Sequence, residues 1–389
     1  MTTALSVSSA RESVTVALLP IMAVVLVAFL VIGLGLPVLP LHVHTTLGFG
    51  TLIVGVVTGS QFVASLLSRF WSGRTCDTHG PKVAVIAGLA AASASGLIYG
   101  LSLYIANPTV SVIALIAGRA LLGAAESIVI TGATVWGLSR AGAASAGKVI
   151  AWMGTAMFAA FAISAPIGVV VYSRAGFAGI AAITTLAPVL TLLVVWPLRG
   201  VIPDRKNAAS MFSVISKIWA PGLGAALSSI GFGVIVSFAS LLFASHGWMP
   251  VWLAFSSYAV ALILARLLFG HLPDKVGGAR VALACAIVEA SGLAIMGLSS
   301  SVVPAAVGAA LTGLGYALVF PGLGVEAVKR APPASRGIAM GAYTACLDLA
   351  LGVSGPLLGL IAGHSGFSAV FLVAAICVLC VVPIALRLK

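Results

Sequence analysis

The amino-terminal part of the chain carries no charged side chain between Glu12 and Arg69. A membrane-spanning helix needs about 20 consecutive apolar residues, so this uncharged run is too long for a single crossing. We divide it at the polar stretch 42–50 into two predicted helices. Pro37 and Pro40 are expected to kink or end the first of them. Its apolar part is longer than that of a cleaved signal sequence, and no small-x-small cleavage site follows.

The composition extends this interpretation to the whole chain. It is 61% hydrophobic and 7% charged, with a mean hydropathy of +1.21. Soluble domains contain roughly 25% charged residues, so the chain cannot solvate a large aqueous surface. The 44 glycines suit close packing of helices in lipid.

The five cysteines fall mostly in apolar runs and form no secreted disulfide framework. Cys377 and Cys380 form a C-x-x-C inside an apolar helix, where packing is favoured over redox or metal chemistry.

The same division continues to the carboxyl terminus and predicts an all-α membrane protein with twelve transmembrane helices in two pseudo-symmetric six-helix bundles. The predicted domains are 1–198, a cytoplasmic linker 199–217, and 218–389. The predicted helices lie near 14–41, 51–72, 83–105, 109–137, 146–172, 176–198, 218–244, 250–272, 280–299, 303–328, 337–362 and 367–386.

Lysine and arginine residues predict the orientation. All 20 of them except Arg119 and Arg174 lie on the side of the termini or in the linker. Cytoplasmic loops of membrane proteins carry such an excess, so both termini and the 69–82 loop are predicted to be cytoplasmic, in a cytoplasmic (inner) membrane. The net charge of +12 therefore marks one side of a bilayer, and no nucleic-acid partner is expected.

A short motif occurs twice, at an offset of 197 residues, in two polar turns between apolar runs. A repeat at half the chain length indicates two similar halves. Its glycines permit a tight turn and close helix approach, and the motif predicts a cytoplasmic gate. The predicted gate residues are Arg69, Gly73, Asp77, Gly80 and Lys82 in the first copy and Arg266, Gly270, Asp274 and Gly277 in the second.

Together, these features resemble the major facilitator superfamily. The first turn matches the signature loop of that family at Gly73, Asp77, Gly80 and Lys82. It departs at Thr78, where a basic residue is usual.

Further motifs extend the resemblance over essentially the whole chain. Arg119 and Gly123 are similar to the family's helix 4 arginine motif, and 165–168 partly matches the G-P-x-x-G motif of its antiporters. A fuller version of the second motif occupies 352–359. The run 320–356 resembles the bacterial YhhS/YfcJ-type branch, usually labelled sugar or drug efflux permeases, which implies export.

The resemblance also implies a mechanism. Two halves would rock around a site at the middle of the membrane to give alternating access. Asp77 is expected to face the amino terminus of helix 11, and Asp274 that of helix 5. A carboxylate there gains about 0.3–1 kcal/mol.

Ionisable side chains inside membrane helices are costly and are functional candidates by default. Arg119 and Glu126 lie seven residues apart on one predicted helix and so share a face. A carboxylate beside an arginine in the cavity could exchange a proton for substrate, whereas a permanent ion pair would only hold the helix in place.

Asp348 lies at the middle of another helix and can be protonated near neutral pH, either as a proton carrier or as a neutral hydrogen-bonded acid. For Glu289, on a helix that is peripheral in this family, a structural role is favoured.

The predicted function is therefore secondary active transport, as proton-coupled efflux of a small organic molecule. Proton coupling is assigned to Glu126 and Asp348. Helix 1 has no charged residue, and Arg119 favours a neutral or anionic substrate. Further cavity candidates are Gln61, Ser228, Ser229, Tyr316, Phe320 and Tyr343.

Import or facilitated uptake of a neutral or anionic nutrient is the alternative within transport. An intramembrane enzyme or receptor is disfavoured, because no G-x-S-x-G, H-E-x-x-H or P-loop occurs. No cofactor or metal is expected beyond the proton as coupling ion, no catalytic residue is assigned, and the protein is predicted to act as a monomer in the lipid bilayer.

Overall fold

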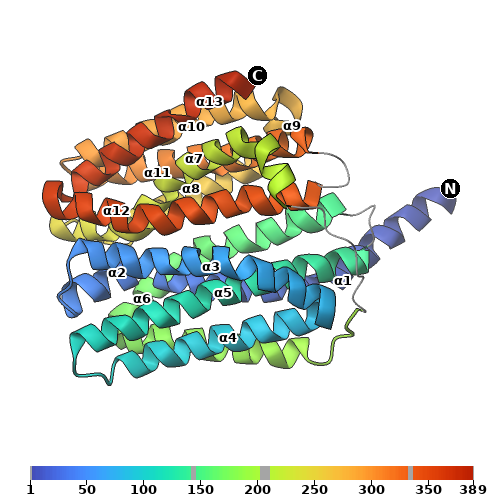
Figure 1. Cartoon of the computed structure of the whole chain (residues 1–389), viewed down its shortest axis with the longest axis horizontal. Helices are drawn as coiled ribbons and strands as arrows, with labels where there is room; N and C mark the ends of the chain where they lie inside the picture. Colours follow the sequence, from blue (N-terminus) through green and yellow to red (C-terminus); the bar gives the residue numbers. More distant parts are fainter. Residues whose placement is uncertain (1, 142–145, 202–210, 332–335, 389) are drawn as a thin grey trace. The chain divides into compact units, whose positions relative to one another are not determined.

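The computed structural model describes residues 2–141, 146–201, 211–331 and 336–388. All regular elements in these ranges are helices, most of them long and joined by short turns (Figure 1). The elements are α1 (Thr2–Gly35), α2 (Leu39–Leu41), η1 (His42–Thr46), α3 (Thr51–His79), α4 (Pro81–Ser102), α5 (Pro108–Ala141), α6 (Ala146–Val195), α7 (Met211–Ser245), α8 (Leu253–Phe269), α9 (Leu272–Val276), α10 (Gly278–Leu298), α11 (Val302–Arg330), α12 (Arg336–Leu379) and α13 (Val381–Leu388).

Nine helices in the described ranges are long and apolar enough to cross a membrane. Two of these stretches, Trp152–Val195 with 44 residues and Ala339–Leu388 with 50, are about twice the length that one crossing needs. Each contains a non-helical glycine, Gly176 (φ 59°) or Gly366 (φ 79°), at which two helices meet. These two pairs and the shorter apolar helix α8 account for the predicted segments that do not appear as separate long helices.

The first predicted helix ends where its prolines suggested. The α-helical hydrogen-bonding of α1 stops at Gly35, just before Pro37, and the chain continues as the short α2 and a π-helical turn up to Thr46. Proline has no backbone N–H to donate and restricts the preceding residue, so the break follows from the local sequence.

The two repeated turns differ from the sequence prediction in their extent. The segment from Arg69 to His79 continues α3, and the turn is confined to Gly80. In the second copy, α8 ends at Phe269 and the short helix α9 follows before Gly277. Gly80 and Gly277 both have positive φ, 91° and 103°, and both precede the next helix directly. Only glycine adopts this conformation without strain, so these positions confirm the predicted tight turns.

Contacts divide the described chain into two compact units that do not follow the two sequence halves. Unit 1 comprises Met1–Leu34, Ala64–Ser164 and Val171–Lys206, and unit 2 comprises Gly35–Val63, Ala165–Val170 and Asn207–Lys389. The first part of α3 therefore packs with helices from the second half of the sequence. The predicted bundle boundaries remain predictions, and residues 202–210 of the predicted linker lie outside the described ranges.

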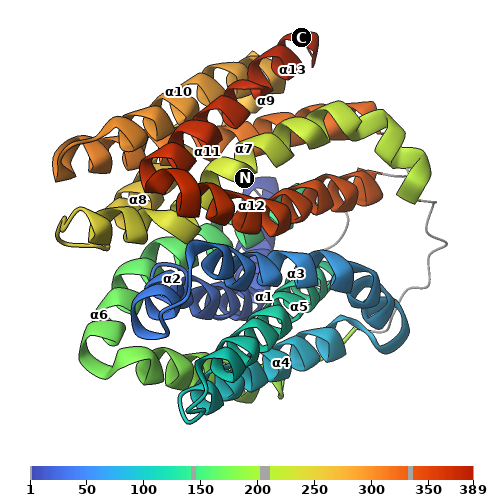
Figure 2. The same ribbon diagram turned by 60° about the vertical axis from the view of Figure 1, so that its left-hand side comes forward.

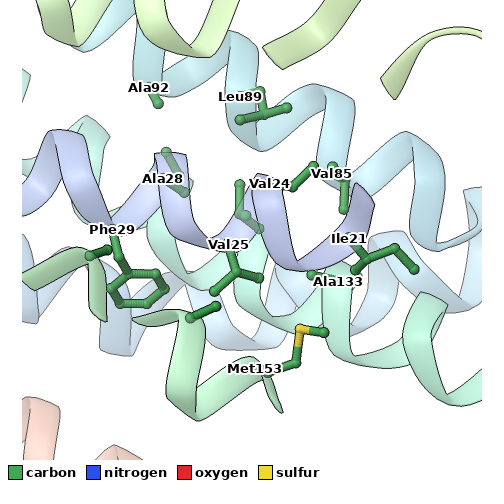
Figure 3. Packing of buried hydrophobic residues seen from close by; sticks show 14 of the residues in the cluster. Ile21, Val24, Val25, Ala28, Phe29, Val85, Leu89, Ala92, Ala133 and Met153 are labelled. Carbon is green, nitrogen blue, oxygen red and sulfur yellow. The ribbon is translucent and has the colours of Figure 1, made fainter. Parts of the chain in front are cut away.

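Unit 1 is built around aliphatic side chains of α1, α4, α5 and α6. Figure 3 shows Val24 and Ala28 of α1 next to Val85 and Leu89 of α4, with Met153 of α6 on the other side of α1. Small residues let the helix backbones approach closely. A Cβ atom added at Gly88 of α4 would lie 3.1 Å from the backbone oxygen of Ala125 in α5.

In unit 2, α10 and α11 lie side by side along their length (Figures 1 and 2). Glycines on both helices make this contact. A Cβ added at Gly308 of α11 would lie 2.6 Å from the backbone oxygen of Gly292 in α10, and one at Gly315 would lie 2.5 Å from the backbone oxygen of Cys285. The expectation that the many glycines serve close helix packing is confirmed at these positions.

Candidate functional site

The first copy of the repeated motif lies at the end of α3. Asp77 and Thr78 are exposed. The Thr78 hydroxyl, in place of the usual basic residue, donates a 2.7 Å hydrogen bond to the backbone oxygen of Arg74. Burial, and then the charge of Asp77, raise the pKa of the Cys76 thiol to about 11, so this cysteine stays protonated at neutral pH. Lys82 donates from Nζ to the backbone oxygen of Trp196 at 2.7 Å, which joins the start of α4 to the end of α6.

The second copy is organised differently. Gly270 forms the carboxyl-terminal cap of α8, and the side chain of Asp274 lies outside the described part of the structure. Nε and Nη2 of Arg266 are shielded from solvent, and its guanidinium lies within electrostatic range of Tyr258 and Tyr316. The gating role predicted for both copies stays a prediction.

Arg119 of α5 is the largest buried cationic side chain among the described residues, with 0% of its surface exposed. None of its three guanidinium nitrogens forms a hydrogen bond with a residue in the described ranges. Glu126, two helical turns further along α5, is partly buried. A buried guanidinium without hydrogen bonds costs stability, so the roles predicted for Arg119 stay predictions, and ligand binding is taken up below.

Three of the predicted cavity residues come together in unit 2. The Tyr343 hydroxyl on α12 donates to the backbone oxygen of Phe320 on α11 at 2.6 Å, and their ring centroids are 4.8 Å apart. Tyr316 is near enough to Tyr343 to interact with it electrostatically and stacks on Phe232 of α7 at 5.6 Å. Gln61 of α3 is fully buried in the same unit.

Asp348 is close to this aromatic group. It is 4% exposed and lies within electrostatic range of Tyr316. Glu326, at the end of α11, forms an ion pair with Arg330, whose Nη1 lies 2.7 Å from its Oε2. Lys329 lies 3.0 Å from the other carboxylate oxygen. Glu326 is therefore part of the helix end, whereas Asp348 belongs to the interior of unit 2.

Glu289 is a buried polar residue whose surroundings the sequence did not reveal. It is 0% exposed on α10, and Ser228 of α7 donates a 2.7 Å hydrogen bond to its Oε2. The repeat offset of 197 places Glu289 opposite Ala92, so an acid replaces an alanine between the two halves. This asymmetry separates Glu289 from the residues that the two halves share, whereas its partner Ser228 could not be read from the sequence.

The G-x-x-G-P-x-x-G segment of α12 packs against the first half of α3. A Cβ added at Gly55 of α3 would overlap the backbone carbonyl of Gly355, and one at Gly59 would lie 2.7 Å from the backbone oxygen of Gly352. Thr51 donates to the backbone oxygen of Gly359 at 2.7 Å. The backbones of α3 and α12, which come from different halves of the sequence, are therefore in direct contact.

The family model of the Major Facilitator Superfamily matches residues 21–254 and 222–389. The chain belongs to the major facilitator superfamily. An uncharacterized MFS-type transporter of Salmonella typhimurium is 41% identical over 372 residues, covering 95% of each chain. One of Pseudomonas aeruginosa is 40% identical over 381 residues, covering 98% of this chain and 95% of the relative.

Solved structures of the superfamily share its fold at low identity. The human organic anion transporter MFSD10 superposes with a TM-score of 0.71 at 16% identity, over 95% of this chain and 98% of that one. A mutant of the nucleoside transporter NupG gives a TM-score of 0.76 at 14% identity, over 96% of this chain and 99% of that one. The protein is thus a multi-pass membrane transporter of the major facilitator fold and not an enzyme.

Proposed function

We propose that this transporter exports a small organic molecule in exchange for protons. The observation that carries the proposal is Asp348, a carboxyl group within a membrane-spanning helix that is 4% exposed and neighbours Tyr316. Acidic groups inside a membrane-spanning helix cost free energy, and they mark proton or ion pathways. Glu126 on α5 is the second proposed proton carrier. The resemblance of 320–356 to efflux permeases supports export over uptake.

The proposal also assigns a substrate class and a location. The buried guanidinium of Arg119 would hold a neutral polar or anionic group, as a charge-assisted hydrogen-bond donor. Gln61, Tyr316, Phe320 and Tyr343 are the other proposed substrate-binding residues. The transporter would act as a monomer in the cytoplasmic membrane with both termini cytoplasmic, and the repeated motif would serve as its cytoplasmic gate.

Replacing the two proposed proton carriers tests the coupling. Candidate substrates are first selected by thermal shift on the purified protein and then assayed in proteoliposomes. Glu126→Gln and Asp348→Asn keep the side-chain shape but cannot exchange a proton. The double variant is expected to lose substrate flux driven by a pH gradient, while exchange of labelled for unlabelled substrate continues.

The control is flux down a substrate gradient without a pH gradient, which needs no proton exchange in a folded facilitator. If both single variants and the double variant still concentrate substrate in response to a pH gradient, neither carboxyl group carries the coupling proton. If the wild-type protein itself does not respond to the pH gradient, the chain is a facilitator or uses another ion.

A further inference from the structure

We propose that Glu289 is a third proton-binding site, and that its protonation controls the contact between α7 and α3. The inference deepens the proposed proton coupling and rests on it. The inference rests on the position of the Glu289 carboxyl group. Glu289 is on α10, packs against α11 and accepts a hydrogen bond from α7.

The packing around the carboxyl group is unusually close. Ser228 of α7 donates to Oε2, while Oε1 points to Gly231 one turn further along the same helix, where any Cβ would overlap it. On the α11 side, a Cβ added at Gly315 would lie 2.6 Å from the Cβ of Glu289. Gly231 therefore leaves room for the Glu289 carboxyl group, and Gly315 lets the backbones of α11 and α10 approach closely.

The two carboxylate oxygens have different surroundings. Oε2 accepts the Ser228 hydrogen bond, whereas Oε1 has no hydrogen-bond partner among the residues described. Buried polar atoms are nearly always paired, and an exception calls for a functional or structural reason. Oε1 is therefore the atom that takes up the proton in this proposal. Uptake forms one O–H bond, release breaks it, and no other bond changes.

Other titratable and charged groups face this region from the neighbouring helices. Tyr258 of α8 interacts electrostatically with Glu289, Tyr316 and Arg266, so it connects the carboxyl group to a buried guanidinium. Cys285, one turn earlier on α10, is also within electrostatic range of Glu289. Asp348 of α12 reaches the group through Tyr316.

Protonation changes what the carboxyl group offers to α7. The carboxylate only accepts hydrogen bonds, and Ser228 satisfies one oxygen. The neutral acid also carries a donor on Oε1, which faces the α7 backbone at Gly231. Because no side chain intervenes there, α7 must shift or the acid must rotate to satisfy the new donor. Either response alters the α10–α7 contact.

Helix α7 extends from this site to the contact with α3. Ser237 lies nine residues after Ser228, about 13.5 Å along the helix axis. Its hydroxyl lies 3.0 Å from that of Thr58 on α3, within the glycine-rich segment that packs against α12. A rigid helix that contacts Glu289 at one point and α3 at another can transmit a shift between them.

Infrared difference spectra of the purified protein test the site without any substrate. Spectra recorded over a pH series should show a carboxylic-acid carbonyl band in the wild type, and Glu289→Gln should remove one titrating component of it. Ser228→Ala, which removes the hydrogen bond to Oε2 and keeps the acid, should shift the midpoint of that component and retain its amplitude. Gly231→Ala serves as a second variant, because its methyl group displaces Oε1 without removing the carboxyl group, and should also shift the midpoint.

Spin labels at Leu52 of α3 and Ala244 of α7, both exposed positions, report the α7–α3 contact in a cysteine-free background. The distance distribution should change with pH in the wild type and be constant in Glu289→Gln. If Glu289→Gln and Gly231→Ala leave both the infrared titration and the distances unchanged, while Asp348→Asn removes them, the Glu289 site is wrong and the proposed proton coupling stands. If the wild type shows no pH dependence by either method, both proposals are overturned.

Discussion

Substituting Gly55 by alanine is expected to slow turnover by roughly one to two orders of magnitude. The new Cβ would meet the backbone carbonyl of Gly355, which has no rotamer through which to move aside. Overpacking of this kind costs about 1–3 kcal/mol. If that cost falls only on the conformation in which α3 packs against α12, its population drops about 5- to 150-fold relative to the other conformations. Substrate affinity in those other conformations should be retained.

Transport in proteoliposomes gives the turnover, and spin labels at the exposed positions Leu52 of α3 and Leu360 of α12 give the fraction of molecules with α3 against α12. The matched control is Gly341→Ala on α12, where a Cβ has no described heavy atom within 4 Å. That variant should resemble the wild type. Normal turnover with a depleted α3–α12 contact in Gly55→Ala would show that this contact is not needed for the transport cycle, and an unchanged distance distribution would contradict the overpacking.

The second large effect is expected at Arg119. Arg119→Ala should weaken substrate binding roughly 30-fold or more, because losing one partner of a buried charged hydrogen bond costs about 2–5 kcal/mol. Arg119→Lys should restore only part of the affinity if the guanidinium binds its ligand through two parallel bonds, since lysine offers a single point charge.

Binding measured by calorimetry on purified variants separates this role from a structural one. Arg140→Ala is the control on the same helix. Arg140 donates to the backbone oxygen of Arg199 at 2.9 Å and lies over the Trp136 ring, so its loss should lower thermal stability and leave affinity unchanged. If Arg119→Ala binds substrate normally but unfolds at a lower temperature, Arg119 is part of the scaffold.

The fold was largely predictable because a membrane leaves few alternatives. Lipid cannot satisfy backbone hydrogen bonds, so apolar runs of sufficient length must become helices, and the repeat indicated two related halves. The turns at Gly80 and Gly277 followed from glycine spacing alone. The sequence did not predict that Arg69–His79 is helical. Helix ends depend on tertiary packing as well as on local polarity.

The candidate site was less predictable, because depth in the membrane does not reveal the partner of a side chain. Asp348 and Glu289 have similar sequence surroundings, yet only the fold shows that Ser228 bonds to Glu289 and that both acids lie within electrostatic range of Tyr316. Likewise, Arg69 and Arg266 match in the repeat, but Arg266 has tyrosine neighbours that the motif does not encode. Contacts of this kind join residues far apart in the chain and are set by packing.

The single-residue breaks at Gly176 and Gly366 have a consequence for biosynthesis. At each break, two apolar helices are joined by a very short turn. The turn is too short for the second helix to insert into the membrane separately from the first. We expect the two helices of each pair to enter the bilayer together as a preformed hairpin. A ribosome stalled between them would expose an unpaired apolar segment to quality-control proteases, whereas one stalled after the second helix would leave a protected product.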